Sequence, residues 1–424
     1  MMKILFLTEN YPPETNAAAN RVHERAKFWA DWGHDVTVIT CAPNFPKGRL
    51  HDGYANKWYQ TGVMDGIRVV RVKTFITANE GVARRMLDFL SFMITGFFAS
   101  LFQNRPDVVV ATSPQFFTAV AGWAVGLCRR RPFVLELGDI WPASIIAVGA
   151  MEPGFIMRVL ERLELFLYRR SAAIVALTPK FKENLIGRGI SGDKISIVIN
   201  GVDTNRFQKT SRDNALSVDW GLKDRFVIGY IGTHGMAHGL ANVLNAAALL
   251  RGNERVTFLF VGDGAERDKL MSIAAQEGLD NVEFIASQPR EKVPSIWSVC
   301  DVALVHLRDS VVFSEVIPSK IFEAMAMGLP ILLVAPKGIA SDIILSTRSG
   351  LWVPAEKPDR LAHIASRLSE KPGLLERLGR NGSAASGRFS RRRQAEEMIR
   401  VLEIAAAGDG GRSGVDSDPQ KFRG

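Results

Sequence analysis

Short apolar runs rich in β-branched residues alternate with helical patterns along both halves of the chain, and this alternation constrains the fold more than any other feature. The first runs are KILFLT at 3–8 and DVTVIT at 35–40, with a helical pattern from about 20 to 32 between them. Strands that alternate with helices in this way form parallel sheets, because each helix carries the chain back to the edge where the next strand begins. Further runs of the same kind lie at 67–72, 107–112, 132–137 and 172–177. The first half is therefore predicted to be a doubly wound α/β domain.

A polar, turn-rich segment at 201–207 interrupts the alternation, and we place the domain boundary just before it. The alternation then restarts, and the second half is predicted to be another α/β domain. A chain of 424 residues is long enough for two such domains. We expect a first domain over 1–199, a second over 200–390, and a disordered tail over 405–424, where Gly, Asp and Ser dominate.

The charge balance favours an anionic partner. The chain has 53 Lys and Arg against 44 Asp and Glu, a formal charge of +9. A phosphorylated ligand, an acidic membrane or a nucleic acid would each fit this charge. No recognised nucleic-acid motif accompanies it, so we expect no nucleic-acid partner. The three cysteines have neither metal-ligand nor redox spacing, which fits a reducing cytoplasm.

No membrane-spanning segment or signal peptide is predicted. The apolar start of the chain ends at Leu7 without a cleavage site and is predicted to be a first strand. The phenylalanine-rich uncharged run at 89–102 is shorter than the roughly 20 residues that a spanning helix needs.

The most informative motif in the second half contains two glutamates, Glu315 and Glu323, on either side of a predicted helix start. Pro318 suits the first turn of this helix, and Lys320 lies near its N-terminus. A helix N-terminus beside a lysine attracts an anion, and a carboxylate can accept hydrogen bonds from two ribose hydroxyls. The alternative is an ordinary helix whose Glu and Lys side chains are solvated.

This motif resembles the signature of the GT-B-fold glycosyltransferases of family 4, in which two glutamates are separated by seven residues. The wording IPSKIFEAMAMGLPIL is similar to the WbuB-type branch, which transfers N-acetylated amino sugars in surface-polysaccharide assembly. The resemblance covers roughly residues 3 to 400. It implies two Rossmann-like doubly wound domains facing a central cleft, with the helix at about 391–404 packing back on the first domain.

The resemblance also implies a donor site in the second domain. Glu323 would hold the donor ribose, Glu315 would face the sugar or phosphate, and Ser319 and Lys320 would lie near the diphosphate. The loop GTHGMAHG at 232–239 stands where family members hold the diphosphate with an Arg and a Lys, and it contains neither residue. His234, loop N–H groups, Lys320 and Arg308 are the expected replacements. The complete donor-binding set is Gly232, Thr233, His234, Gly262, Gly264, Arg308, Ser319, Lys320 and Glu323.

In the first domain, the loop and helix start at 10–21 replace the family's Gly-rich acceptor loop with Asn and Ala. An ordinary strand-to-helix turn is the alternative there. Asp139 follows a buried strand, where it could contact the transferred sugar or cap the next helix. The predicted acceptor-binding residues are Tyr11, Asn16, Asn20 and Arg21, and the predicted catalytic residues are Asp139, Glu315 and Lys320.

Taken together, the resemblance implies a retaining transfer from a nucleoside-diphosphate sugar to a lipid-linked saccharide, and it favours a UDP-linked donor. We expect no cofactor and no metal, because the only Asp-x-Asp pattern, at 416–418, lies in the tail. The segment 84–102 has two interpretations, a buried crossover helix or an interfacial helix on an anionic membrane. The second predicts peripheral attachment to the inner face of the cytoplasmic membrane. A GT-B nucleotide-sugar epimerase and a non-catalytic sugar-binding protein are the alternative functions.

Overall fold

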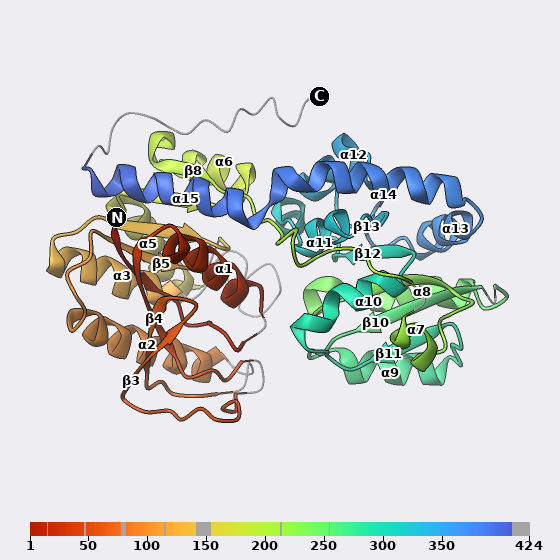
Figure 1. Ribbon diagram of the computed structural model, residues 1–424, viewed down its shortest axis with the longest axis horizontal. Helices are drawn as coiled ribbons and strands as arrows, with labels where there is room; N and C mark the ends of the chain where they lie inside the picture. The colour runs from red at the N-terminus through yellow and green to blue at the C-terminus, as the bar shows by residue number, and fades with distance from the viewer. Residues whose placement is uncertain are drawn as a thin grey trace. The chain divides into compact units, whose positions relative to one another are not determined.

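The computed structural model describes residues 1–14, 16–45, 48–77, 82–113, 116–140, 154–212, 214–253 and 255–408 (Figure 1). The chain divides into two compact units. Unit 1 contains Met1–Asn200 and the segment that begins at Arg391, and unit 2 contains Gly201–Ser390. The tail predicted to be disordered lies outside the described residues from position 409 onward.

Unit 1 is built on an eight-stranded sheet with the order β3-β4-β2-β1-β5-β6-β7-β8. Every neighbouring pair is parallel except β3 and β4, which form an antiparallel hairpin at one edge. The strands are β1 (Lys3–Leu7), β2 (Asp35–Cys41), β3 (Tyr59–Met64), β4 (Ile67–Val72), β5 (Val108–Thr112), β6 (Phe133–Leu137), β7 (Ala173–Ala176) and β8 (Ile195–Ile197).

The hairpin strand β3 is absent from the sequence prediction. Its residues are mostly exposed, so it lacks the apolar run that marks the other strands. The turn between β3 and β4 consists of Asp65 and Gly66, both with positive φ. An Asp-Gly pair of this kind favours a tight hairpin turn and is the signal by which β3 could have been found.

Helices cover both faces of the unit 1 sheet. Alternate residues of a strand point to opposite faces, so Ile4 and Phe6 pack toward α1 and α15, while Leu5 and Leu7 pack toward the other helices. The indole Nε1–H of Trp29 in α1 donates to the carbonyl of Ala395 in α15 (3.0 Å), which ties the late helix to the early one. The helices are α1 (Ala17–Asp31), α2 (Val82–Leu101), α3 (Phe116–Arg129), α5 (Phe155–Arg170), α6 (Pro179–Gly187) and α15 (Arg391–Ala406). Among the described helices, none is long and apolar enough to cross a membrane.

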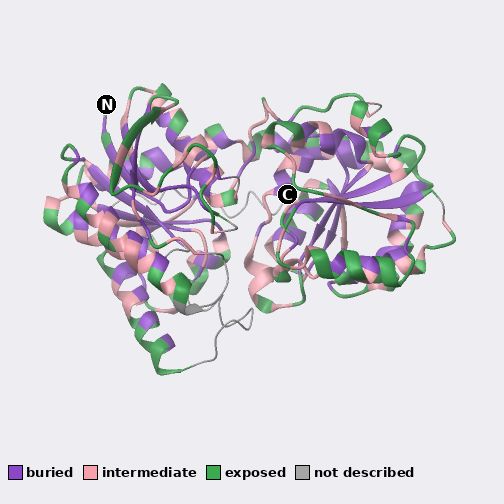
Figure 2. Cartoon of the chain, turned by 90° about the horizontal axis from the view of Figure 1, so that it is seen from below, coloured by how far each residue is buried: buried purple, intermediate pink, exposed green. Residues whose placement is uncertain are grey.

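Unit 2 is built on a six-stranded, fully parallel sheet with the order β11-β10-β9-β12-β13-β14. The central strands are buried along their length, as parallel strands covered on both faces should be (Figure 2). The strands are β9 (Phe226–Ile231), β10 (Val256–Val261), β11 (Val282–Ile285), β12 (Val302–His306), β13 (Ile331–Val334) and β14 (Gly350–Val353).

The helices of unit 2 pack closely on this sheet. Gly229 in β9 permits the close approach of α10, because a Cβ at this position would lie 2.3 Å from the Sγ atom of Cys300. The helices are α7 (Ala215–Asp219), α8 (Ala241–Leu249), α9 (Arg267–Gln276), α10 (Val293–Val299), α11 (Lys320–Ala326), α12 (Ile339–Thr347), α13 (Pro358–Ser369) and α14 (Pro372–Ser386). The two parallel sheets confirm the predicted α/β fold class.

The strand orders also predict where each unit would bind a ligand. In unit 2 the chain runs from β9 out to β11 and then returns to β12 on the other side of β9. In unit 1 the same reversal lies between β1 and β5. Open α/β sheets bind ligands at the carboxyl ends of the strands beside such a reversal. The loops after β9 and β12, and those after β1 and β5, are therefore the places to look for function.

Candidate functional site

Two loops of unit 2, residues 232–239 after β9 and 262–264 after β10, lie in direct backbone contact, and we call them the glycine loops. A Cβ on Gly262 would lie 1.9 Å from the carbonyl oxygen of Gly232, and a Cβ on Gly264 would lie 2.5 Å from that of His234. Gly262 and Gly264 also have φ near +155°, which side-chain-bearing residues rarely adopt. The His234 N–H donates to the Asp263 carbonyl (2.9 Å), which joins the two loops. Only glycine fits at these contacts.

The imidazole of His234 is fully buried between the glycine loops and the sheet. Its ring contacts the aromatic rings of Tyr230, Phe260 and Phe284. Neither ring nitrogen has a hydrogen-bond partner among the described residues. Burial, together with the nearby Arg267 and Lys320 side chains, lowers the pKa of His234 to about 4. The ring is therefore neutral at pH 7.

Two further histidines, His238 and His306, connect the first glycine loop to the end of β12. The Nδ1–H of His306 donates to the carbonyl of His238 (2.6 Å), and the Nδ1–H of His238 faces the carbonyl of His306 (3.3 Å). The amide of Asn242 donates to Nε2 of His306 (2.8 Å). Burial lowers the pKa values of His238 and His306 to about 3 and about 4. Both rings are neutral and serve as fixed connections between loop and strand.

Lys320, the first residue of α11, points its ammonium group at the first glycine loop. Its Nζ atom lies 3.6 Å from the ring centroid of Tyr230 and 3.0 Å from where a Cβ on Gly232 would be. The side chain is buried, and Nζ has no hydrogen-bond partner among the described residues. The face of a tyrosine ring favours a cation by about 0.5–2 kcal/mol. Burial nevertheless lowers the pKa of Lys320 to about 7, although the Glu323 carboxylate raises it.

Glu323, one turn further along α11, is held by the indole of Trp297. The Nε1–H of this fully buried tryptophan donates to Oε2 of Glu323 (3.1 Å). The positive charge of Arg206 also acts on this carboxylate. One oxygen of Glu323 is therefore fixed by the protein, which orients the half-buried carboxylate at the start of α11.

The other residues predicted for the donor site lie on either side of α11. Glu315 is half-buried and ends a short 3₁₀ turn, Val311–Glu315. Ser319 caps α11 without a side-chain hydrogen bond. The helix begins at Lys320, so Pro318 precedes its first turn rather than lying in it. The Ile321 N–H donates to the Pro318 carbonyl, which forms a tighter turn ahead of the helix. Arg308 is exposed, and its Cγ packs over Gly239.

In unit 1, the predicted acceptor residues make contacts within the protein. Asn16 caps α1 by accepting from the Ala19 N–H (2.9 Å) and donates to the side chain of Asn10 (2.9 Å). Tyr11 is buried against α1 and packs edge-on against His23. Asn20 is half-buried in α1. These contacts shape the loop after β1.

Arg21 belongs to a buried ion cluster at the same edge of the unit 1 sheet. Its Nε donates to Oε1 of Glu136 (2.8 Å), and Nη1 of Arg25 lies 3.0 Å from the same oxygen. Burial alone would raise the pKa of Glu136, but Arg25 and Arg21 outweigh it and hold that pKa below its usual value. A Cβ on Gly138 would lie 3.1 Å from Nη2 of Arg21, so this guanidinium reaches the loop after β6.

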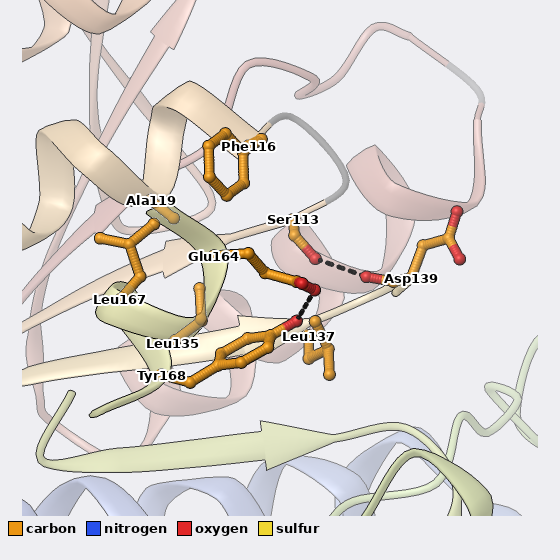
Figure 3. Close-up of a pocket in the computed structure, with 9 residues that line it drawn as sticks. All are labelled: Ser113, Phe116, Ala119, Leu135, Leu137, Asp139, Glu164, Leu167 and Tyr168. Carbon is orange, nitrogen blue, oxygen red and sulfur yellow. Dashed lines mark hydrogen bonds between the residues drawn. The ribbon is translucent and has the colours of Figure 1, made fainter. Parts of the chain in front are cut away.

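Asp139 lies in that loop, beside a small cavity (Figure 3). Its carbonyl accepts from the Ser113 hydroxyl (3.3 Å), while its carboxylate points away from Glu164 and Tyr168. The cavity holds about 10 Å³, the room for one water molecule, so it is too small for a saccharide. The predicted capping of the next helix by Asp139 concerns residues 141–153, which lie outside the described residues.

Two family models match the chain. The model described as "Glycosyl transferase 4-like domain" matches residues 16–201, and "Glycosyl transferases group 1" matches residues 214–385. The chain is a family 4 glycosyltransferase.

Similar proteins span nearly the whole of this glycosyltransferase. WcaI of Escherichia coli K12, named for colanic acid biosynthesis, is 26% identical over 374 residues, which cover 86% of this chain and 91% of WcaI. A GDP-mannose-dependent alpha-mannosyltransferase of Mycobacterium tuberculosis is 26% identical over 382 residues, covering 86% and 88% of the two chains. The Anabaena protein HepE, solved with UDP and glucose, matches with a TM-score of 0.72 at 20% identity over 95% of this chain and 100% of HepE. That likeness confirms the predicted GT-B fold.

The unit 2 half of the predicted site contains residues that the sequence did not single out. Tyr230, Trp297, His306 and Arg267 all contact or act electrostatically on the predicted donor residues. His306 could have been found, because it is the last residue of a strand beside the reversal in strand order. Arg267 begins α9 directly after the glycine loops and places a cation there that is not among the predicted donor-binding residues.

Proposed function

We propose that this glycosyltransferase transfers an N-acetylated amino sugar from a UDP-linked donor to a lipid-linked saccharide, with retention, as a member of the WbuB-type branch. In this reaction the bond between the anomeric carbon and the diphosphate breaks. A new bond to an acceptor hydroxyl forms on the same face of the sugar, and the hydroxyl proton passes to the departing diphosphate. The chemical demand on the protein is to neutralise charge on that leaving group.

The single observation that carries the donor assignment is the arrangement of Lys320 and Glu323 beside the glycine loops. The buried amine of Lys320 points toward Gly232 in the first glycine loop. The carboxylate of Glu323, held by Trp297, lies about one turn further along the same helix. A diphosphate against Lys320, with Arg267 and Arg308 adding charge, would leave Glu323 to accept from ribose hydroxyls. The UDP bound by HepE supports the same class of donor.

The proposed role in surface-polysaccharide assembly rests on the relatives. The name of WcaI assigns it to colanic acid biosynthesis. The motif at 317–332 favours an amino-sugar donor within this group. In unit 1, the acceptor would bind beside the loop after β1, where Asn16, Asn20 and Arg21 lie, and Asp139 would be a polar group for the transferred sugar. In unit 2, Glu315 would face the sugar or phosphate of the donor.

A lipid-linked acceptor requires access to a membrane, and α2 offers a suitable surface. Its buried side, with Phe92 and Ala99, packs into the core of unit 1. Its opposite side leaves Ile94 and Phe98 more than half exposed, and Phe102 just beyond the helix is 80% exposed. Arg84 and Arg85 are exposed at the other end of the helix. Apolar side chains with flanking arginines suit the headgroup region of an anionic membrane, and we propose peripheral attachment to the inner face of the cytoplasmic membrane.

Donor binding to a Glu323→Ala variant tests the proposed site. A carboxylate that accepts from ribose hydroxyls contributes about 1.5–3 kcal/mol. We therefore expect the Kd for UDP-N-acetylglucosamine to rise by about 10- to 100-fold, measured by calorimetry with EDTA present. Glu283→Ala, an exposed glutamate of the same unit, is the matched control and should leave the Kd unchanged.

Product analysis then distinguishes the functions. Transfer to a lipid-linked saccharide extract, with an anomeric coupling constant that matches the donor, supports retaining transfer. An isomerised free nucleotide sugar would indicate an epimerase, and unchanged donor affinity in the Glu323→Ala variant would contradict the donor assignment.

A further inference from the structure

The amine of Lys320 sits in surroundings that suit it better without a charge than with one. Its Nζ atom is buried and has three potential N–H donors, yet none of the described residues accepts a hydrogen bond from it. A buried ammonium without acceptors loses its hydration and gains nothing in exchange, whereas a neutral amine loses much less.

The titratable and charged groups around Lys320 provide little compensation. On its own helix, Glu323 is the nearest carboxylate, and one of its oxygens is already bonded to Trp297. From β9 and its loop, Tyr230 presents a ring face, and His234 and His238 are neutral. From β12, the neutral His306 faces it as well.

Binding of a diphosphate would reverse this balance. The proposed donor brings two phosphate charges to the glycine loops, directly beside Nζ, and their oxygens are strong acceptors for all three N–H groups. We propose that above pH 7 Lys320 is uncharged in the empty enzyme and takes up a proton when the diphosphate of the donor binds. This inference rests on the proposed donor site, and it adds that binding of the nucleotide is coupled to protonation of Lys320.

The direction of the resulting pH dependence follows from linkage. The pKa of Lys320 is about 7 in the empty site and is raised in the complex. At pH 8 the empty enzyme then lacks the proton and the complex holds it, so binding takes up about 0.9 proton; at pH 6 the proton is already present and uptake falls to about 0.1. Above pH 7 the Kd for the donor should rise by about tenfold per pH unit.

Calorimetric titration with UDP-N-acetylglucosamine, whose diphosphate does not titrate in this range, measures the uptake. The binding enthalpy is recorded at pH 6 and pH 8 in two buffers of different ionisation enthalpy, and its dependence on the buffer gives the protons taken up. Lys320→Arg, which stays charged, should bind the donor with no uptake at pH 8, and Lys320→Met should bind at least tenfold more weakly with no uptake. Melting curves of both variants establish that they are folded.

The outcomes separate the inference from the function on which it rests. Uptake at pH 8 in the wild type that disappears in Lys320→Arg supports the inference. Tight binding without uptake, or uptake that persists in Lys320→Arg, overturns it while leaving the donor site intact. Failure of UDP-N-acetylglucosamine, UDP-glucose and GDP-mannose all to bind the wild type would instead overturn the proposed function.

Discussion

Single residues in this enzyme act through the burial of charge. In unit 1, Glu136 is fully buried, and its negative charge is matched by Arg21 and Arg25 from α1. In unit 2, Lys320 is buried with no such partner. The first arrangement pairs opposite charges inside the protein and supports structure, and the second leaves a buried amine without a directly paired carboxylate, which suits a ligand. A direct ion pair, rather than burial itself, distinguishes the two roles.

The buried ion cluster predicts an acid-sensitive contribution to stability. The pKa of Glu136 is lowered in the folded protein, so its contribution is complete above the unfolded pKa and is lost as pH falls through the folded one. Removing one partner of a buried pair costs about 3–5 kcal/mol. Glu136→Gln should therefore destabilise the protein strongly at pH 7, and by progressively less as the pH falls through the lowered pKa of Glu136, in denaturant melts followed by circular dichroism.

The matched control is Glu183→Gln, which breaks the exposed pair with Lys180 and should cost less than about 0.5 kcal/mol. Equal losses for both variants at pH 7 would contradict the importance of the buried cluster.

At the scale of elements, the two glycine loops behave as one unit because their backbones touch. A methyl group on Gly262 would collide with the carbonyl of Gly232, and neither backbone can move aside as a flexible side chain could. The loops are also connected to β12 through His238 and His306. Their geometry is consequently set by three strands together.

Gly262→Ala should force the loops apart and reduce donor binding. We expect the Kd for UDP-N-acetylglucosamine to rise by about 5- to 100-fold, since overpacking against backbone typically costs about 1–3 kcal/mol and a tenfold change in Kd corresponds to about 1.4 kcal/mol. Gly252→Ala is the control, because a Cβ at this position meets nothing within 4 Å. Wild-type affinity in Gly262→Ala would show that the loop contact is not needed for the donor.

The sequence predicts elements much better than it predicts contacts between them. The buried strands and the glycine loops leave clear patterns, because continuous apolar runs and Gly-x-Gly turns are local signals. The indole of Trp297 reaches Glu323 from another helix, and no local pattern shows this pairing. The burial of Lys320 is equally invisible, since lysines are almost always exposed and only the folded loops enclose this one.

For the molecule as a whole, the exposed side of α2 is the surface on which the proposed membrane attachment depends. Replacement of Ile94, Phe98 and Phe102 by serine removes the apolar side chains and leaves the buried side of the helix unchanged. Full burial of one large apolar side chain contributes about 1.5–3 kcal/mol. Loss of three such side chains should therefore lower the affinity for vesicles containing anionic lipid at least tenfold, as measured by co-sedimentation.

Val63→Ser removes an exposed apolar residue from the β3 hairpin and should leave vesicle binding unchanged. If the triple serine variant still binds vesicles like the wild type, the membrane surface lies elsewhere. Turnover of a water-soluble acceptor analogue should be the same in all three proteins.

The position of α15 in unit 1 affects how the protein folds during its synthesis. This helix covers Trp29 and pairs Arg391 with Glu24, yet it is translated only after all of unit 2. While the ribosome is still synthesising unit 2, the apolar face of α1 that α15 will cover remains exposed to solvent. We therefore expect unit 1 to complete its folding only after α15 is synthesised, and its uncovered apolar face to be accessible to chaperones until then.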